Sequence, residues 1–498
     1  MLRIAAFYLL ALTLSLPAAA EKTLRFAMWG LPAEGGNPFA ALQLPAILTI
    51  PAVYDGLTHI QYDGTVTPQL ALAWRRENDL TWIFDLRRDA RFSNGEPLDA
   101  SAIAAAFDYL RTDEGKLSAV GREVEAIVRA EARDPYTLAL TTKSPKALLP
   151  REVATVRIPA PEWWRKVGPA GAARAAVGSG PFTVTEWTDN RIVFAANRAS
   201  WRAPRIDRVT MTTLPDQNSR MQALLSGAVD VATSIGPDDR GAIEAAGGRF
   251  VASLWAGVTT IFFVATTPGP VADVRVRQAL NYAVDKDRIV ATLMGGATVV
   301  ASQPAAPGTF GHNPDLSPYP YDPARARALL AAAGYPAGFE MTIEVPAGIG
   351  VNADAWHVQV ASDLAEVGVR VTLRSISMIS LTQKIYSGKW EGQAFTAAFN
   401  TLPSLDALRA FRQHSCLWPH PWYCNPADTP LIEAAQREGD PDRLEGMVQE
   451  LLRRYHDDPP GIYMFQLPGF TALGPRVKNF VTDYGIYNFH DVELTAKD

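Results

Sequence analysis

The order of apolar and polar residues predicts a mixture of strands and helices in the first 200 residues. Segment 23–28 alternates between the two classes, which predicts a strand that ends at Trp29-Gly30 and a Gly/Pro-rich loop. Segment 82–86 places its large side chains on one face of a further strand. Apolar residues recur at helical spacing in segment 100–110, directly after Asp99, which predicts a helix with an aspartate N-cap.

From about position 270 the pattern changes to alternating helices and strands. Asp273, Asp285 and Asp322 each stand directly before an apolar helical repeat, where an aspartate can cap the helix. Segment 340–373 has the pattern of a strand, a helix and a second strand. Such units predict a parallel or mixed sheet covered by helices, so the expected fold class is α/β.

The first 20 residues have the three parts of a secretory signal peptide. Arg3 supplies the positive charge, segment 4–16 is apolar, and Ala18-Ala19-Ala20 offers a small-residue cleavage site. We therefore expect export and cleavage after Ala20, with a retained N-terminal anchor as the alternative. No later segment is long and apolar enough to predict a membrane span, so stable membrane insertion is not expected.

Length and charge limit the classes of function. A chain of 498 residues is too long for one ordinary core and predicts two or three domains. The net charge is −5, and basic residues are interspersed with acidic ones without a dense run. Nucleic acid is therefore not an expected partner.

Motifs of catalysis are missing from the sequence. It contains no H-E-x-x-H pair, no G-x-S-x-G elbow and no G-x-x-x-x-G-K-[ST] phosphate loop. We therefore expect neither an enzyme nor a bound cofactor or metal. His414, Cys416, His420 and Cys424 have the side chains of a zinc site, but two nearby cysteines in an exported chain favour a Cys416–Cys424 disulfide.

Several segments, in this order, resemble one family: the dipeptide- and oligopeptide-type extracellular solute-binding proteins (family 5). That family serves ABC importers of peptides, nickel chelates, opines and some sugars. The resemblance extends over nearly the whole chain after residue 67. The segments that carry it are 68–74 (PQLALAW), 82–87 (WIFDLR), 91–98 (RFSNGEPL), 178–182 (GSGPF), 273–286 (DVRVRQALNYAVDK), 321–330 (YDPARARALL), 333–336 (AGYP) and 457–463 (DDPPGIY).

The resemblance implies a two-lobe periplasmic binding protein of the type II-like, cluster C architecture. Lobe I would comprise residues 21–267 and 471–498, with an inserted subdomain at about 45–170, and lobe II would comprise 268–470. It also implies a periplasmic monomer that encloses a small molecule between the lobes and delivers it to ABC permease subunits. The alternatives are a peptide- or metal-chelate-binding member of the same family and, more remotely, an exported metal-dependent hydrolase.

The resemblance also directs attention to lobe II near residue 400. Peptide binders of the family hold the ligand amine with an aspartate, and Leu402 matches that position within one residue. A buried ammonium without a carboxylate is costly, so an ordinary free peptide is not the expected ligand unless Asp406 or another acid compensates.

The expected ligand contacts come from both lobes. For each of these residues the alternative is a place in the core or on the surface without ligand contact. The predicted ligand-binding residues are Trp29, Gly30, Trp255, Phe399, Asn400, Thr401, Trp422 and Arg374.

Overall fold

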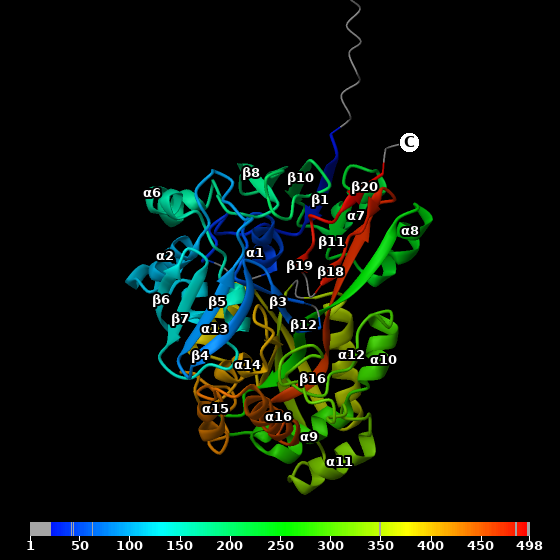
Figure 1. The fold of residues 1–498 in the computed structure, drawn as a ribbon. Coiled ribbons are helices and arrows are strands. Elements are labelled where there is room, and N and C mark those ends of the chain that lie inside the picture. The colour runs from blue at the N-terminus through cyan, green and yellow to red at the C-terminus, as the bar shows by residue number, and fades with distance from the viewer. Residues whose placement is uncertain are drawn as a thin grey trace, which may run out of the picture.

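The computed structural model of the chain describes residues 21–40, 42, 44–61, 63–347, 350–483 and 486–495. The predicted signal peptide and its cleavage after Ala20 lie outside the described residues. Most of the segments assigned to predicted lobe I lie in the upper part and at the left of Figure 1, and most of those assigned to predicted lobe II lie in the lower part. No helix in the described part of the chain has both the length and the apolar content needed to cross a bilayer.

One mixed sheet runs through both lobes. Parallel pairs occur in each half of it, β13 with β14 and β1 with β10, while the long central strands β12 and β16 are antiparallel. In spatial order its strands are β14 (Val369–Ile376), β13 (Phe339–Pro346), β15 (Ala394–Asn400), β12 (Arg249–Phe263), β16 (Gly461–Leu473), β11 (Val231–Thr233), β1 (Thr23–Met28), β10 (Arg208–Thr213), β9 (Arg191–Ala196) and β8 (Phe182–Trp187). The predicted mixed α/β fold is therefore confirmed.

A second sheet, at the left of Figure 1, belongs to the predicted inserted subdomain. It is antiparallel throughout, and α2 packs on it. Its strands are β4 (Ala71–Asn78), β5 (Thr81–Leu86), β7 (Thr137–Thr142) and β6 (Ile127–Asp134). Three small pairs complete the strands: β2 (Thr58–Ile60) with β3 (Val66–Pro68), β17 (Val477–Lys478) with β20 (Glu493–Leu494), and β18 (Thr482–Asp483) with β19 (Ile486–Tyr487).

The helices divide between the lobes in chain order. Those of lobe I are α1 (Leu44–Thr49), α2 (Ala100–Leu110), α3 (Asp113–Leu117), α4 (Ala119–Glu123), α5 (Leu149–Glu152), α6 (Pro161–Ala172), α7 (Gln217–Leu225) and α8 (Arg240–Ala245), with the short 3-10 turns η1 (Ile50–Ala52), η2 (Val153–Thr155) and η3 (Pro237–Asp239). Those of lobe II are η4 (Pro270–Ala272), α9 (Val274–Ala283), α10 (Lys286–Leu293), α11 (Pro323–Ala332), α12 (Ala353–Glu366), α13 (Met378–Ser387), α14 (Ala407–Gln413), α15 (Thr429–Ala435) and α16 (Pro441–Asp457).

The predicted aspartate caps are present. Asp99, Asp273, Asp285 and Asp322 each accept a hydrogen bond from a backbone N–H in the first turn of the helix that follows. A capped N–H no longer needs water, so each aspartate fixes where its helix begins.

The strands β12 and β16 pass from one lobe to the other. Residues Gly257–Phe263 of β12 pair with β15, whereas the start of the strand, from Arg249 to Leu254, pairs with β16 alone. Their ladder is irregular between Leu254 and Val258, where a bulge bends a strand. At this level β12 and β16 cross between the predicted lobes, and we call it the hinge. The predicted boundaries after residues 267 and 470 stay predictions.

The expected disulfide between Cys416 and Cys424 is present. Since both thiols are consumed, the alternative zinc site loses two of its four ligands. The bridged loop follows α14, and the Trp418 indole within it donates a hydrogen bond to the carbonyl of Ile385. The bridge therefore fixes a loop of lobe II against α13.

Candidate functional site

A small cavity lies where lobe II meets the first 160 residues of lobe I. We call it the Arg157 pocket, and its volume is about 40 Å³. That volume holds no more than a few water molecules, so the lobes are close together here. Its walls are formed by Pro38, Leu42, Ala46, Ile47, Ile50, Pro51, His59, Ile60, Ala154, Thr155, Arg157, Leu402 and Pro403.

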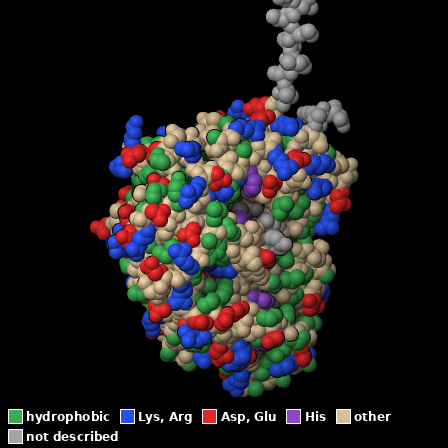
Figure 2. Space-filling view, in the orientation of Figure 1, with side chains coloured by type: hydrophobic (Ala, Val, Ile, Leu, Met, Phe, Trp, Pro, Cys, Tyr) green, Lys and Arg blue, Asp and Glu red, His purple; other side chains and the backbone are tan. Residues whose placement is uncertain are grey.

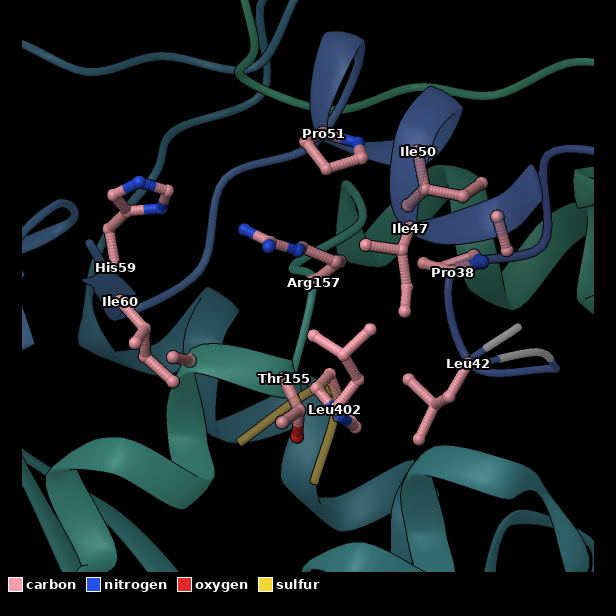
Figure 3. A pocket seen from close by; sticks show the side chains of 13 residues that line it. Pro38, Leu42, Ile47, Ile50, Pro51, His59, Ile60, Thr155, Arg157 and Leu402 are labelled. Atoms are coloured by element: carbon pink, nitrogen blue, oxygen red, sulfur yellow. The ribbon is translucent and has the colours of Figure 1, made fainter. Parts of the chain in front are cut away.

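Apolar side chains from both lobes seal this pocket. Ile60 and Ala154 of lobe I form one buried cluster with Leu402 and Leu405 of lobe II. Figure 3 shows Leu402 among the apolar side chains, while the Arg157 guanidinium points toward His59 and Pro51. Because this cluster contains residues of both lobes, its burial depends on the lobes being closed.

Arg157 is the charged group of the pocket and has no carboxylate partner among the described residues. Its one hydrogen bond runs from Nη1 to Gln69 Oε1 at 3.4 Å. Asp55, which is fully buried, is already paired with Arg202 at 2.6 Å. Burial, with a smaller contribution from the charge of Arg202, lowers the pKa of Arg157 to about 10, and the charge of Asp55 opposes this shift. The guanidinium therefore stays charged at pH 7 without an ion pair of its own within the described residues.

His59 faces the same pocket without adding charge. Burial, assisted by the charges of Arg157 and Arg202, lowers the pKa of His59 to about 4. The ring is therefore neutral at pH 7 and offers one N–H donor and one acceptor nitrogen.

A second, larger cavity adjoins the first. We call it the Asp406 cleft; it measures about 580 Å³, which is the size of a pocket for a small molecule. Thr155 borders both cavities, so the two are neighbours. The walls of the Asp406 cleft are formed by Arg122, Glu123, Glu125, Ala126, Lys143, Ser144, Lys146, Ala147, Leu148, Glu152, Thr155, Ser404, Asp406, Leu408, Arg409, Arg412, Leu417, Ala435, Gln436, Arg437, Glu438 and Leu444.

Polar contacts between the lobes surround the Asp406 cleft. Arg151 is 8 % exposed, and its Nη1 donates to the carbonyls of Ser404 at 3.2 Å and Leu405 at 3.4 Å. Arg409 of lobe II pairs with Glu123 of lobe I at 2.8 Å. Within the described part of the chain, no other ion pair joins the two lobes. These contacts join the two lobes in this structure.

Two of the predicted lobe I contacts, Trp29 and Gly30, lie outside both cavities. The Trp29 side chain is 40 % exposed directly after β1. Trp255 lies at the hinge, where its carbonyl accepts a hydrogen bond from Gln466. Its indole packs so closely on β16 that a Cβ at Gly469 would lie 2.3 Å from Nε1. Ligand contact by these three residues stays a prediction.

The predicted lobe II segment near residue 400 does reach the Arg157 pocket, through Leu402 and Pro403. Thr401 is buried and donates its hydroxyl to the carbonyl of Ala256 at the hinge. Asn400 is exposed and accepts a hydrogen bond from the N–H of Leu402. These two residues position the segment, and Leu402 is the side chain that faces the pocket.

The other three predicted lobe II contacts point elsewhere. Phe399 and Trp422 are at most 1 % exposed, and both pack around Phe262 in the core of lobe II. Large aromatic rings bury the most apolar area there, which explains the orientation. Arg374 lies in β14, is half-exposed and pairs with Glu391. The structure gives none of the three a place in either cavity.

Arg157 and His59 are absent from the residues selected from sequence. Each interrupts an apolar segment: Arg157 stands within 153–161, and His59 stands within 57–60. A single charged or ionisable side chain in a run that is otherwise buried needs a partner or a function. That signal is present in the sequence and marks both positions.

Charged side chains of both signs cover the visible face of the molecule without a large patch of one sign (Figure 2).

Comparisons with known proteins agree with this architecture. The sequence model of a family described as "Bacterial extracellular solute-binding proteins, family 5 Middle" matches residues 65–414. The Nickel-binding periplasmic protein of Escherichia coli (strain K12) is 29 % identical over 442 residues, covering 82 % of each chain.

Solved structures show the same fold. NikA from Brucella suis in complex with Fe(III)-EDTA has a TM-score of 0.82 at 24 % identity, covering 95 % of this chain and 100 % of the other. The ABC transporter substrate-binding protein CtaP from Listeria monocytogenes has a TM-score of 0.85 at 18 % identity, covering 96 % and 100 %. The predicted two-lobe fold is therefore confirmed.

Proposed function

This chain belongs to the bacterial extracellular solute-binding proteins of family 5 and is a periplasmic solute-binding component of an ABC importer, not an enzyme; we propose that its solute is a small organic anion with an apolar body. The solute's negative group would pair with Arg157, and its apolar part would contact the clustered side chains around Leu402.

The observation that carries this proposal is that the Arg157 guanidinium forms no ion pair within the described residues and has a single hydrogen bond, to Gln69. A guanidinium in an apolar pocket is stabilised strongly by a carboxylate that accepts two parallel hydrogen bonds. Neutral His59 can add a hydrogen bond to the same group without competing for its charge.

The walls of the Arg157 pocket also favour a negative over a positive group on the solute, because Leu402 stands where related peptide binders have an aspartate. An ammonium group placed here would meet the positive charge of Arg157 and find no carboxylate in the walls of the pocket.

A carboxylate-bearing metal chelate is the second candidate. The match over 82 % of the chain to a relative named for nickel binding favours it. Such a chelate would present carboxylates to Arg157 in the same way as a free acid. The two candidates differ in whether a metal accompanies the acid.

Closure couples binding to transport in this proposal. The solute contacts residues of both lobes, 21–267 with 471–498 on one side and 268–470 on the other, only when the β12–β16 hinge is closed. Binding then shifts the population toward the closed form, which the permease can distinguish from the open form.

Thermal-shift titration tests the ligand class with hexanoate, adipate and a nickel–citrate chelate. A bound probe at 100 times its Kd should stabilise the folded protein by about 2.7 kcal/mol. Arg157→Gln should abolish the shift, while Arg122→Gln, which removes an arginine beside the neighbouring cleft, should retain it. Unchanged binding by Arg157→Gln would overturn the proposal, as would the absence of a shift with every acid and chelate.

We also propose how the chain matures and in which oligomeric state it acts. Cleavage after Ala20 would give a mature chain that begins at Glu21, which intact-mass spectrometry of periplasmic material can measure. We propose that the mature protein is a monomer, and light scattering during size exclusion can check its mass.

A further inference from the structure

Lobe II touches the inserted subdomain at a further place, at the edge of the Asp406 cleft. There the turn 438–440, directly before α16, meets the loop 143–147, directly after β7. The N–H of Ala147 donates to the carbonyl of Glu438 at 3.3 Å, and both residues line the cleft. Arg76 of β4 donates from Nη1 to the next carbonyl of the turn at 2.5 Å. The subdomain therefore binds two successive backbone carbonyls of lobe II.

Gly439 allows the two segments to approach this closely. A Cβ at this position would lie 2.9 Å from Pro145 Cβ and 3.2 Å from Arg76 Nη2. Non-bonded carbon atoms attract each other best at about 3.5–4.0 Å, so a contact at 2.9 Å would be repulsive. The arginine can turn aside, whereas the proline ring is stiff. A side chain at position 439 would therefore hold the turn away from the loop.

The loop is fixed on both sides of Pro145. The hydroxyl of Thr142 donates to the carbonyl of Ser144 at 2.7 Å. Trp82 Nε1 donates to the carbonyl of Lys146 at 3.1 Å. The proline is therefore held in place by its own subdomain, independently of lobe II.

The turn is fixed to the start of α16 in the same way. Glu438 Oε1 accepts from the N–H of Asp440 at 2.7 Å and from Arg443 at 3.0 Å. Asp440 is the N-cap of the helix and accepts from the N–H groups of Asp442 and Arg443. Two surfaces that are each already ordered lose little conformational freedom when they meet.

We propose that the turn 438–440 is a latch that engages the inserted subdomain each time the lobes close, and that Gly439 is required for full closure. The turn and the loop belong to different lobes, so opening about the hinge would separate them. The bonds to Ala147 and Arg76 would then exist only in the closed form and would slow its opening and the release of the solute. The latch does not depend on which chemical group Arg157 binds.

Hydrogen exchange of the Ala147 amide tests the latch, because its bond to Glu438 protects it only while the lobes are closed. Mass spectrometry follows exchange in the protein alone and with saturating hexanoate, adipate or nickel–citrate. In the condition that protects the amide most, Gly439→Ala should raise its exchange rate at least about tenfold. Gly446→Ala, also at an α16 glycine, is the matched control, because a Cβ there would meet nothing within 4 Å beyond its neighbours in the helix. It should leave the rate within about twofold of wild type.

The fold of the subdomain has its own readout in the same experiment. Amides of β5 and β7 should exchange at wild-type rates in both variants, which separates loss of the latch from unfolding. Where the wild-type Ala147 amide is protected, an unchanged rate in Gly439→Ala would overturn the latch, as would an equal rise in Gly446→Ala.

If the wild-type amide is unprotected in every condition, a cysteine pair decides without a solute. The Cβ atoms of a disulfide lie about 3.5–4.5 Å apart, so Pro145→Cys with Gly439→Cys can be linked just before full closure. Pro145→Cys with Gly446→Cys is the control and should stay unlinked. A disulfide between positions 145 and 439, found by peptide mapping after oxidation, would support the latch, and its absence would overturn it. Neither result bears on the anion site, which the Arg157→Gln titration tests separately.

Discussion

The Arg157 pocket and the Asp406 cleft are neighbours between the same two lobes, but they differ in size, polarity and free charge. The pocket is about 40 Å³, apolar and centred on one unpaired cation, whereas the cleft is about 580 Å³ and carries charges of both signs. The difference indicates a division of roles. A tight apolar pocket selects one end of a solute, and a roomy polar cleft tolerates a variable remainder.

Different forces close the lobes over each cavity. Burial of Leu402 and Leu405 with lobe I side chains closes the pocket, and this attraction is nearly independent of salt. The cleft is spanned by the Glu123–Arg409 ion pair and the bonds of Arg151, which depend on charge and geometry. Substitutions on the two sides should therefore affect binding in distinguishable ways.

The largest effect is expected from Leu402→Asp. It places a second negative group beside Arg157, which competes with the anionic end of the solute and adds a charge that must be desolvated. Affinity for the best carboxylate probe should fall about a hundredfold, or about 2.7 kcal/mol. Leu402→Asn is the control of equal size, and calorimetry should show a much smaller loss for it. Equal losses in both variants would mean that charge at this position does not matter.

Arg151→Gln should have the next largest effect, on the side of the cleft. Loss of the guanidinium leaves the carbonyls of Ser404 and Leu405 without their donor in the closed form. Affinity should fall about tenfold, or about 1.4 kcal/mol. Arg151→Lys keeps the charge but cannot reach several carbonyls at once, so it should be intermediate. An unchanged Kd in Arg151→Gln would contradict a role for these bonds in closure.

Glu123→Gln should have a smaller effect that depends on salt. The pair with Arg409 is partly exposed, so its removal should weaken binding only about two- to fivefold. The difference from wild type should vanish near 1 M NaCl, where exposed charges are screened. Glu131→Gln removes the partly exposed pairs with Arg129 and Arg133 in the same subdomain and should leave Kd unchanged. A loss that persists in high salt would show that the ion pair is not its cause.

The dependence of stability on pH should have opposite signs for the two cavities. The pKa of His59 falls from 6.5 to about 4 on folding, so the unfolded chain binds more protons and stability decreases as pH falls across that range. The pKa of Asp406 rises from 3.8 to about 6, so the folded chain binds more protons and stability increases as pH falls from 6 to 3.8.

Melting temperatures between pH 7 and pH 4 test these signs. His59→Gln should lose less stability on acidification than wild type, and Asp406→Asn should lose more. Parallel pH profiles for wild type and both variants would show that neither group is perturbed by its cavity.

Much of the fold could be predicted from sequence because its signals are local. Aspartate caps, periodic apolar residues and the pair Cys416–Cys424 all act over a few residues, and the structure contains them. The segment near residue 400 was also located, through the match of Leu402 to an aspartate of related proteins.

The side chains of the site were harder to predict because their environment is made by distant segments. Phe399 and Trp422 have the composition of ligand contacts, but the core of lobe II buries them around Phe262. Arg157 becomes significant only because Asp55 pairs with Arg202 and not with Arg157. A sequence pattern does not contain that competition between two arginines for one carboxylate.

Small-angle X-ray scattering on the wild-type protein and Arg157→Gln tests most directly whether an anionic solute closes the two lobes. With the carboxylate probe that binds best, the radius of gyration of the wild-type protein should decrease at saturation, and that of Arg157→Gln should not change. A wild-type radius of gyration that stays constant while calorimetry shows full occupancy would contradict closure around the solute.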